Sequence, residues 1–261
     1  MNSIMNMSLI KTISFASLFS GVILFSSCQS SSYTLSSVEG ESIVVDHRYD
    51  ATPNIEAEKI LLTYKNRVDS IMSPVIGYSL IDMSAQRPES TLSNLVADIL
   101  RQSTTTYIGK QADVAVINMG GLRASLPKGD VKYGNIFEIT PFENTLCILK
   151  MSGKDMKELF QNIASVRGEG LSGAQLVVSK EGKLISATIG GADIDDNKMY
   201  NVATVDYLAE GNDNMVTFKK ITDKVQPDGA TLRQIFLDYV KAMSAQGKKL
   251  DSKVEGRIVI K

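Results

Sequence analysis

The chain of 261 residues has no tryptophan and a single histidine, His47. A metal centre built on several imidazole ligands needs more than one histidine, and a Ser-His-Asp triad would have to use this one. The Gly-x-Ser-x-Gly motif of many serine hydrolases is also missing. The sequence therefore excludes a histidine-rich metal centre and gives no support to a serine nucleophile. We expect His47 to lie on the surface or at the end of a strand.

The acidic residues leave one type of metal site open. The densest acidic cluster consists of Asp193, Asp195 and Asp196, and carboxylates alone can hold a hard cation. The cluster lies in residues 190–197, a stretch with glycine and asparagine that is typical of a solvated turn. We therefore favour a turn over a metal site at this position.

The chain is also poor in cysteine and in net charge. It has two cysteines, Cys28 and Cys147, and a net charge of −1. Cys147 lies in the apolar run 146–149, so we expect a buried and inert thiol. Binding to a nucleic-acid polymer needs a concentrated basic surface, which this composition does not provide. DNA and RNA are therefore not expected as partners.

No apolar run after the first 28 residues is long enough to cross a membrane. Residues 10–25 are mostly apolar but too short to span as a stable helix. They lead into Leu24-Phe25-Ser26-Ser27-Cys28, which resembles the bacterial lipobox. We expect a lipoprotein signal peptide over residues 1–27 and an acylated Cys28 that anchors the protein to a membrane of the bacterial cell envelope, facing the periplasm or the outside. The alternative is a plain signal peptide cleaved near Ser27.

The remaining pattern predicts an α+β fold: a single domain with a mixed β-sheet packed by helices. Helices and strands alternate irregularly and several strands are joined by short hairpins, which suits a mixed sheet better than a regular βαβ array. We expect a tether over residues 28–41, an arm of one strand and one helix over 42–75, and the domain over 76–261. Ser152 and Asp155 have the spacing of a capping box at a helix start. The predicted strands cover residues 42–46, 75–83, 112–117, 144–151, 175–179, 184–189, 200–205 and 257–260; the predicted helices run from Thr52-Pro53 to Pro74 and over about 90–105, 152–165 and 231–245.

Polar and aromatic side chains gather beside three of the predicted strands. The segments are Asn118-Met119-Gly120-Gly121-Leu122-Arg123, Pro141-Phe142-Glu143-Asn144 and the stretch 206–213. Loops at strand ends are where ligands are usually held. We therefore predict a pocket formed by Asn118, Arg123, Phe142, Asn144, Tyr207 and Asp213.

The residue types in this set suit a nucleotide. Arg123 offers a planar fork of donors for a phosphate or a ribose oxygen. Phe142 and Tyr207 offer flat faces for stacking a base, and the carboxylate of Asp213 can accept from both hydroxyls of a diol. The alternative is that both aromatic residues belong to the core and that Gly120-Gly121 forms only a turn.

These segments resemble motifs in the C-terminal domain of the 5'-nucleotidase / UDP-sugar hydrolase family. A fourth segment, residues 89–98, resembles the motif that opens that domain, and the four occur in the family's order over about residues 76–260. The resemblance implies a nucleoside-binding domain of that fold. The implied contacts are a base sandwiched by Phe142 and Tyr207, with Asn118 on the base, Arg123 on ribose or phosphate, Asp213 on the ribose, Asn144 at the pocket edge and Arg87 near an arginine that the family uses.

In that family a separate N-terminal metallophosphoesterase domain carries two metal ions and performs the hydrolysis. The resemblance thus implies the nucleotide- or nucleoside-binding half of a 5'-nucleotidase-type hydrolase in nucleotide catabolism. It implies no catalytic residue and no cofactor in this chain, with the divalent metal pair on a separate catalytic chain. Two alternatives stay open: an envelope lipoprotein that only binds nucleosides or nucleotides, and a degenerate domain kept for protein contacts.

The chain departs from the family pattern in several places. Glu143 stands where a glycine is usual, and a carboxylate there would repel a phosphate. Tyr207 replaces a more common phenylalanine and keeps the stacking face. Residues 210–214 replace a glycine-rich turn, which asparagine can support because it tolerates positive φ. Residues 168–173 match the dinucleotide fingerprint literally, but they follow a helix and precede a strand, so we expect a loop that borders the pocket.

Overall fold

The computed structural model describes residues 33–261, so the predictions for the signal peptide and for Cys28 lie outside the described residues. The chain divides into two compact units, with the boundary in the sequence between Asn54 and Ile55. The described part of the first unit holds the short 3₁₀-helix η1 (His47–Tyr49), which Asp46 caps by accepting a hydrogen bond from the Arg48 backbone N–H at 3.0 Å. The strand predicted over residues 42–46 is wrong: this stretch has no strand partner within residues 33–54.

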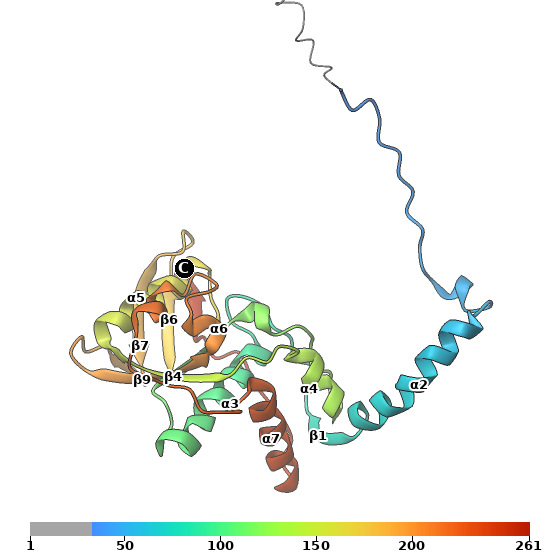
Figure 1. Cartoon of the computed structure of the whole chain (residues 1–261). Coiled ribbons are helices and arrows are strands. Elements are labelled where there is room, and N and C mark those ends of the chain that lie inside the picture. Colours follow the sequence, from blue (N-terminus) through green and yellow to red (C-terminus); the bar gives the residue numbers. More distant parts are fainter. Residues whose placement is uncertain (1–32) are drawn as a thin grey trace, which may run out of the picture. The chain divides into compact units, whose positions relative to one another are not determined.

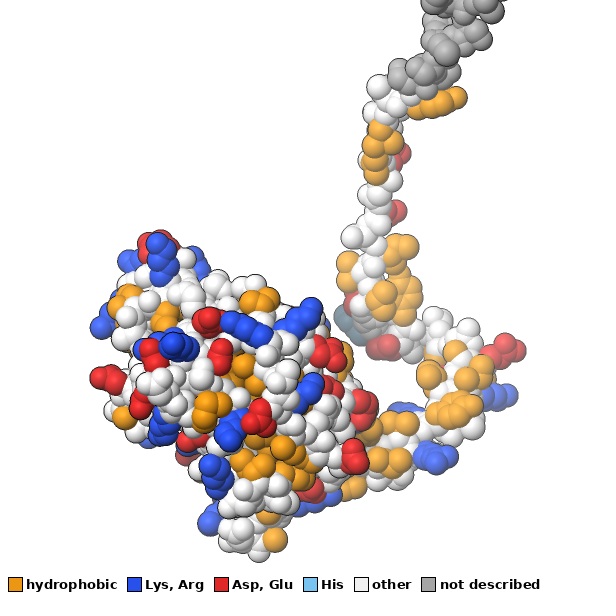
Figure 2. All heavy atoms as spheres, turned by 60° about the vertical axis from the view of Figure 1, so that its left-hand side comes forward, with side chains coloured by type: hydrophobic (Ala, Val, Ile, Leu, Met, Phe, Trp, Pro, Cys, Tyr) orange, Lys and Arg blue, Asp and Glu red, His pale blue; other side chains and the backbone are white. Residues whose placement is uncertain are grey.

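The second unit begins with helix α2 (Ile55–Met72), which starts slightly later than predicted and ends before Pro74. Its apolar residues recur at helical spacing, as predicted, but no residue of this fully described helix is buried. Ile60, Leu61, Tyr64 and Val68 are each at least half exposed. Figure 2 shows apolar side chains on the surface of this segment. The helix therefore carries an apolar stripe that stays largely exposed in the described part of the chain, although α2 also contacts α4.

The core sheet has five strands in the order β10-β4-β9-β2-β5. Strand β2 (Val114–Ile117) is parallel to β9 (Met199–Val205), while β4 (Leu146–Ser152) is antiparallel to β9 and β5 (Gly170–Ser172) is antiparallel to β2. The short β10 (Lys224–Val225) completes the sheet beside β4. As a result, the ends of β2 and β9 and the starts of β4 and β5 lie at the same edge. That edge positions the candidate site.

The other strands form two smaller sheets. The four-stranded sheet has the order β11-β6-β7-β8, and its β6–β7 hairpin confirms the predicted pair around Gly182, where φ is +80°. The closing strand β11 runs parallel to β6, and β1 pairs with β3 in a two-stranded sheet. The bounds are β1 (Val75–Ser79), β3 (Gly129–Lys132), β6 (Ala174–Val178), β7 (Leu184–Ile189), β8 (Ala192–Asp193) and β11 (Ile258–Ile260).

Helices pack on these sheets around one apolar core. Figure 1 shows α5 beside β6 and β7, and α3 beside α7, in agreement with the contacts between these elements. The predicted capping box forms, since the Ser152 hydroxyl accepts from the Asp155 backbone N–H at 3.2 Å. The α+β prediction is therefore confirmed. The remaining helices are α3 (Thr91–Ile108), α4 (Tyr133–Ile139), α5 (Gly153–Ser165), α6 (Asp206–Ala209) and α7 (Leu232–Ala245), with 3₁₀-helices η2 (Met119–Gly121) and η3 (Val216–Lys220).

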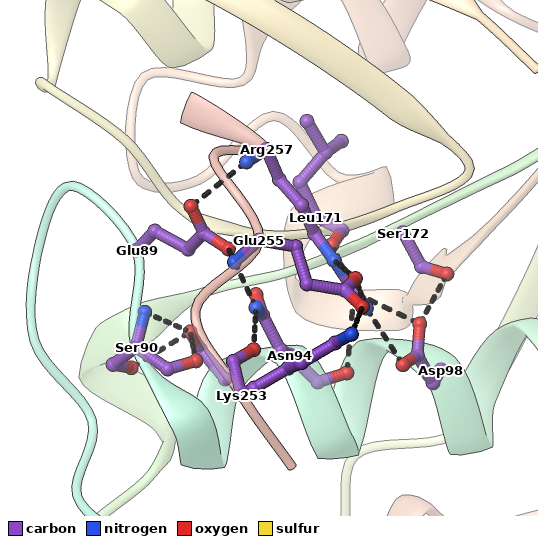
Figure 3. A network of polar contacts seen from close by, with 10 residues as sticks. Glu89, Ser90, Asn94, Asp98, Leu171, Ser172, Lys253, Glu255 and Arg257 are labelled. Carbon is purple, nitrogen blue, oxygen red and sulfur yellow. Dashed lines mark hydrogen bonds and ion pairs between the residues drawn. The ribbon is translucent and has the colours of Figure 1, made fainter. Parts of the chain in front are cut away.

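Residues 89–98, the segment that opens the domain, form hydrogen bonds and an ion pair with the C-terminal residues (Figure 3). The buried carboxylate of Glu89 accepts from the backbone N–H groups of Glu255 and Arg257 at 2.7 and 2.8 Å. The Arg257 guanidinium forms a bidentate pair with Asp98, at 2.8 Å to each oxygen. Charge-assisted and bidentate bonds of this kind are among the stronger polar contacts in proteins. This motif therefore joins α3 to the strand that closes the four-stranded sheet.

Among residues 33–261, none of the helices combines the length and the apolarity needed to cross a bilayer.

Candidate functional site

A pocket of about 250 Å³ opens at the shared edge of the five-stranded sheet. Three separate segments form it: the turn after β2, the loop before β4, and the stretch that follows β9. Each comes from a strand end that the sheet topology brings to one place. The lining residues are Asn118, Gly120, Phe142, Asn144, Tyr207 and Asp213.

The two aromatic residues keep exposed faces in the pocket. Phe142 is 50% exposed and Tyr207 is 39% exposed, so neither ring is sealed in the apolar core. Large apolar side chains that stay exposed in a pocket are typical of ligand sites. The alternative that both rings are core residues does not hold. Their role in stacking a base stays a prediction.

Arg233, at the start of α7, holds the loop that presents Phe142. Its guanidinium donates to the carbonyl oxygens of Thr140, Pro141 and Phe142 at 2.9, 2.9 and 3.1 Å. It also forms an ion pair with Glu143 at 2.8 Å and lies over the ring of Phe137, with its central carbon 4.3 Å from the ring centroid. Glu143 is not among the lining residues, and its charge is matched by Arg233. Sequence reasoning missed Arg233 because it lies far along the chain from this loop.

Asp213 links two walls of the pocket. Its Oδ1 accepts from the Tyr207 hydroxyl at 3.0 Å, and its Oδ2 accepts from the Asn118 amide at 3.2 Å. The hydrogen bond to Asp213 raises the pKa of Tyr207, with the nearby negative charge acting in the same direction. Asp213 and Asn214 adopt positive φ, +49° and +65°, so the turn is maintained without the family's glycines.

Gly121 makes room for the other side of Asn118. A Cβ added at Gly121 would lie 2.8 Å from Asn118 Oδ1, whereas one at Gly120 would meet nothing within 4 Å. Asn118 Oδ1 is buried and has no hydrogen-bond partner in the described part of the chain. The amide is therefore held with its nitrogen on Asp213 and its oxygen against the backbone of the glycine turn.

An ion pair between the buried Glu169 and the partly exposed Arg87 lies beside this turn. The side chain of Glu169 is 0% exposed, accepts a hydrogen bond from the Met119 backbone N–H and pairs with Arg87. Burial raises the pKa of Glu169; the bonds from Met119 and Arg87 oppose the shift and the charge of Asp213 adds to it. Gly168 leaves space for the backbone of Pro88, which a Cβ would approach to 2.3 Å. The loop expected over residues 168–173 is wrong in part, because its centre forms β5.

Five of the seven predicted site residues line the pocket, while Arg123 and Arg87 are not among the lining residues. Arg123 is exposed and donates to the carbonyl oxygen of Gly120 at 3.2 Å, which puts it next to a lining residue. Arg87 is directed to Glu169 and to the carbonyl oxygen of Gly168 at 2.7 Å. The arrangement can stack a planar ring and hydrogen-bond its polar edges or an attached sugar.

The other candidate residues lie elsewhere. His47 is exposed on η1 in the first unit. Asp196 pairs with Lys157 at 2.7 Å, and no group of three metal-ligating side chains occurs among residues 33–261. Cys147 is buried on β4, and desolvation raises the pKa of its thiol to about 11, in agreement with the prediction of an inert thiol.

Comparisons with known proteins identify the fold. A model of the family described as 5'-nucleotidase, C-terminal domain, matches residues 72–220. The chain is 29% identical over 225 residues to the trifunctional nucleotide phosphoesterase protein YfkN of Bacillus subtilis, an alignment that covers 78% of this chain and 15% of YfkN. It is 33% identical over 106 residues to the protein UshA of Escherichia coli, covering 39% of this chain and 19% of UshA.

A solved structure agrees with this assignment. The 5'-nucleotidase precursor from Thermus thermophilus superposes with a TM-score of 0.70 at 27% identity, covering 78% of this chain and 43% of that one. The chain spans less than half the length of each of these relatives. The predicted resemblance is confirmed: the chain belongs to the 5'-nucleotidase C-terminal domain family.

Proposed function

We propose that this protein is the nucleoside- or nucleotide-binding half of a 5'-nucleotidase-type hydrolase and acts with a separate metallophosphoesterase chain. The observation that carries the proposal is the pocket at the edge of the five-stranded sheet, where two exposed aromatic rings lie beside an amide and a carboxylate in a member of this family. Stacking of a base on an aromatic side chain contributes about 1–3 kcal/mol. Base stacking and sugar recognition therefore both have candidate groups.

Each pocket residue has a proposed task. Phe142 and Tyr207 hold the base between them, and Asn118 and Asn144 bond to its polar edges. Asp213 accepts from the sugar hydroxyls, since a carboxylate offers two acceptor oxygens at the spacing of a diol. Arg123, exposed beside Gly120, contacts the ribose or a phosphate.

The catalytic half of the reaction is assigned to the partner. Two-metal phosphoesterases hold their ions with histidine and carboxylate ligands from several loops, and this chain has one histidine. We therefore place the divalent metal pair on the partner chain and no cofactor on this one. Acylation of Cys28 would tether the protein to the cell envelope. Two proteins tethered to one membrane gain effective concentration, so a weak mutual affinity is enough for joint action.

Two measurements test the proposal. Calorimetry of the protein with adenosine, AMP and UDP-glucose should detect binding, and Arg123→Ala should weaken the two phosphate-bearing ligands more than adenosine. Mixing the protein with a metallophosphoesterase chain that lacks this domain should raise nucleotide hydrolysis above that of the phosphoesterase alone. Absence of binding to all three ligands would overturn the binding role, and an unchanged rate in the mixture would overturn the division of labour.

One observation favours a second candidate, a lipoprotein that only captures nucleosides for uptake. Arg87 is engaged by a buried carboxylate, and the lining residues include Asp213 but no lysine or arginine. Such a pocket suits an uncharged nucleoside better than a phosphorylated one. Binding of adenosine without any gain in hydrolysis in the mixture would support this candidate over the first.

A further inference from the structure

The carboxylate of Asp213 is already engaged by the pocket itself. Tyr207 donates to Oδ1 at 3.0 Å from one wall, and Asn118 donates to Oδ2 at 3.2 Å from another. Each oxygen of the carboxylate thus has one internal donor. A ligand that reaches Asp213 meets an acceptor whose capacity is partly used.

The two internal donors differ in what a substitution leaves behind. The Asn118 amide is almost fully buried, with its oxygen against Gly121, so a substitution there would also disturb the glycine turn, while one of its two N–H groups stays on Asp213. The Tyr207 hydroxyl lies in an exposed residue, and a phenylalanine would keep the ring and release Oδ1. The hydroxyl of Tyr207 is therefore the group that controls how much of Asp213 a ligand can use.

We propose that the Tyr207 hydroxyl is a specificity-determining group that competes with the hydroxyls of a bound sugar for Asp213 and so reduces discrimination between ribonucleosides and deoxynucleosides. This inference rests on the proposed nucleoside-binding function of the pocket. A ribose diol donates to both carboxylate oxygens at once, and with Oδ1 engaged by Tyr207 it gains less from the second hydroxyl. A sugar without that hydroxyl loses correspondingly little.

The upward shift of the Tyr207 pKa supports the contact, because a phenol that donates to a carboxylate resists deprotonation. In the described part of the chain, Asp213 is the charged group that contacts the Tyr207 hydroxyl. Asp213 also accepts a hydrogen bond from Asn118. Asp213→Asn should lower the pKa of the Tyr207 phenol. A spectrophotometric titration can measure this pKa if the signal of the matching Tyr207→Phe variant is subtracted.

The test compares dissociation constants for adenosine, 2'-deoxyadenosine and 2',3'-dideoxyadenosine in the full chain and in Tyr207→Phe. We expect the ratio of the dideoxyadenosine constant to the adenosine constant to rise by about tenfold in Tyr207→Phe, mainly through tighter binding of adenosine, which corresponds to about 1.4 kcal/mol. In the double variant Tyr207→Phe/Asp213→Asn the rise should disappear, because the carboxylate that the sugar would use is gone.

The outcomes separate this inference from the function on which it rests. A ratio that is unchanged or smaller in Tyr207→Phe, with adenosine still bound, would overturn the role of the hydroxyl and leave the binding function intact. If none of the three nucleosides binds the unaltered chain, the binding function fails and this inference fails with it. Circular dichroism of each variant shows whether a lost affinity comes from lost folding.

Discussion

The guanidinium of Arg233 donates a hydrogen bond to the carbonyl oxygen of Phe142 at 3.1 Å, across 91 residues of sequence. The Arg233 side chain is only 13% exposed, and the same group bonds to the two preceding carbonyl oxygens. A single side chain therefore fixes the backbone of the loop that carries one aromatic wall. The planar fork of arginine suits this task because its donors point in several fixed directions.

Replacing this arginine should loosen the loop and weaken the pocket. We expect Arg233→Ala to lower the free energy of unfolding by about 2–4 kcal/mol, because several charge-assisted bonds are lost, and to weaken adenosine binding about tenfold. Urea unfolding and calorimetry measure the two effects. Arg233→Lys keeps the charge but cannot donate in all these directions, so most of the loss should persist. Glu143→Gln is the matched control. It removes the ion pair between Arg233 and the exposed Glu143 side chain, which should lower the free energy of unfolding by less than about 1 kcal/mol.

Glu169 should give the stability a distinct pH dependence. Burial raises its pKa above the ordinary value of 4.5, so the folded protein keeps this proton at pH values where the unfolded chain has lost it. The stabilisation is therefore complete at low pH and is lost as the pH rises from 4.5 through the raised pKa. Glu169→Gln removes the titratable carboxyl group. Its stability relative to the unaltered chain should rise across that window, by at most about 1.4 kcal/mol per pH unit for one proton.

Denaturant unfolding at several pH values between 4 and 9 measures this difference. Glu210→Gln, a substitution of an exposed carboxylate near the pocket, serves as the control and should follow the unaltered chain. A constant difference between Glu169→Gln and the unaltered chain at all pH values would contradict the prediction.

The two glycines of the pocket turn should respond differently to alanine. At Gly121 the new methyl group would lie 2.8 Å from Asn118 Oδ1, so the amide must move away from Asp213. We expect Gly121→Ala to cost about 1.5–3 kcal/mol of stability, the value of one hydrogen bond to a charged group. Gly120→Ala meets nothing within 4 Å and should stay within about 0.5 kcal/mol. Equal stability of the two variants would show that Asn118 is not held as described.

Local signals explain which parts of the fold could be predicted. The capping box at Ser152, the hairpin around Gly182 and the apolar period of α3 depend on neighbouring residues, and all three are present in the structure. The strand over residues 42–46 has the composition of a strand, but a strand forms only with a partner. Residues 170–172 look like a loop because glycines flank them, yet pairing with β2 makes them a strand.

The candidate site divides in the same way. Its lining residues are in short segments beside turns, so their types and positions are readable in the sequence. The groups that hold these segments are not: Arg87 and Glu169 are 82 residues apart, and Arg233 joins the loop before β4 from the start of α7. Such pairs have no local signature, because only the folded sheet edge brings them together. Long-range ion pairs were therefore the part that sequence reasoning missed.

The apolar stripe of α2 leads to a prediction about the proposed partner. Leu61 and Tyr64 are 65% and 67% exposed, and α2 lies mostly before the residues that match the family model. Burial of one such side chain in an interface contributes about 1.5–3 kcal/mol. If the metallophosphoesterase chain covers this stripe, Leu61→Glu should weaken its binding by more than tenfold, since a glutamate there must be buried without a partner.

The helix offers its own control. Asn66→Glu adds the same charge on the polar side of α2, where it should change the affinity for the phosphoesterase less than threefold. Biolayer interferometry between the purified chains measures both variants, and adenosine binding should stay unchanged in each because α2 contributes no residue to the pocket. Equal loss of affinity in Leu61→Glu and Asn66→Glu would point to charge rather than to the apolar stripe. No loss in either would place the partner's contact on another surface.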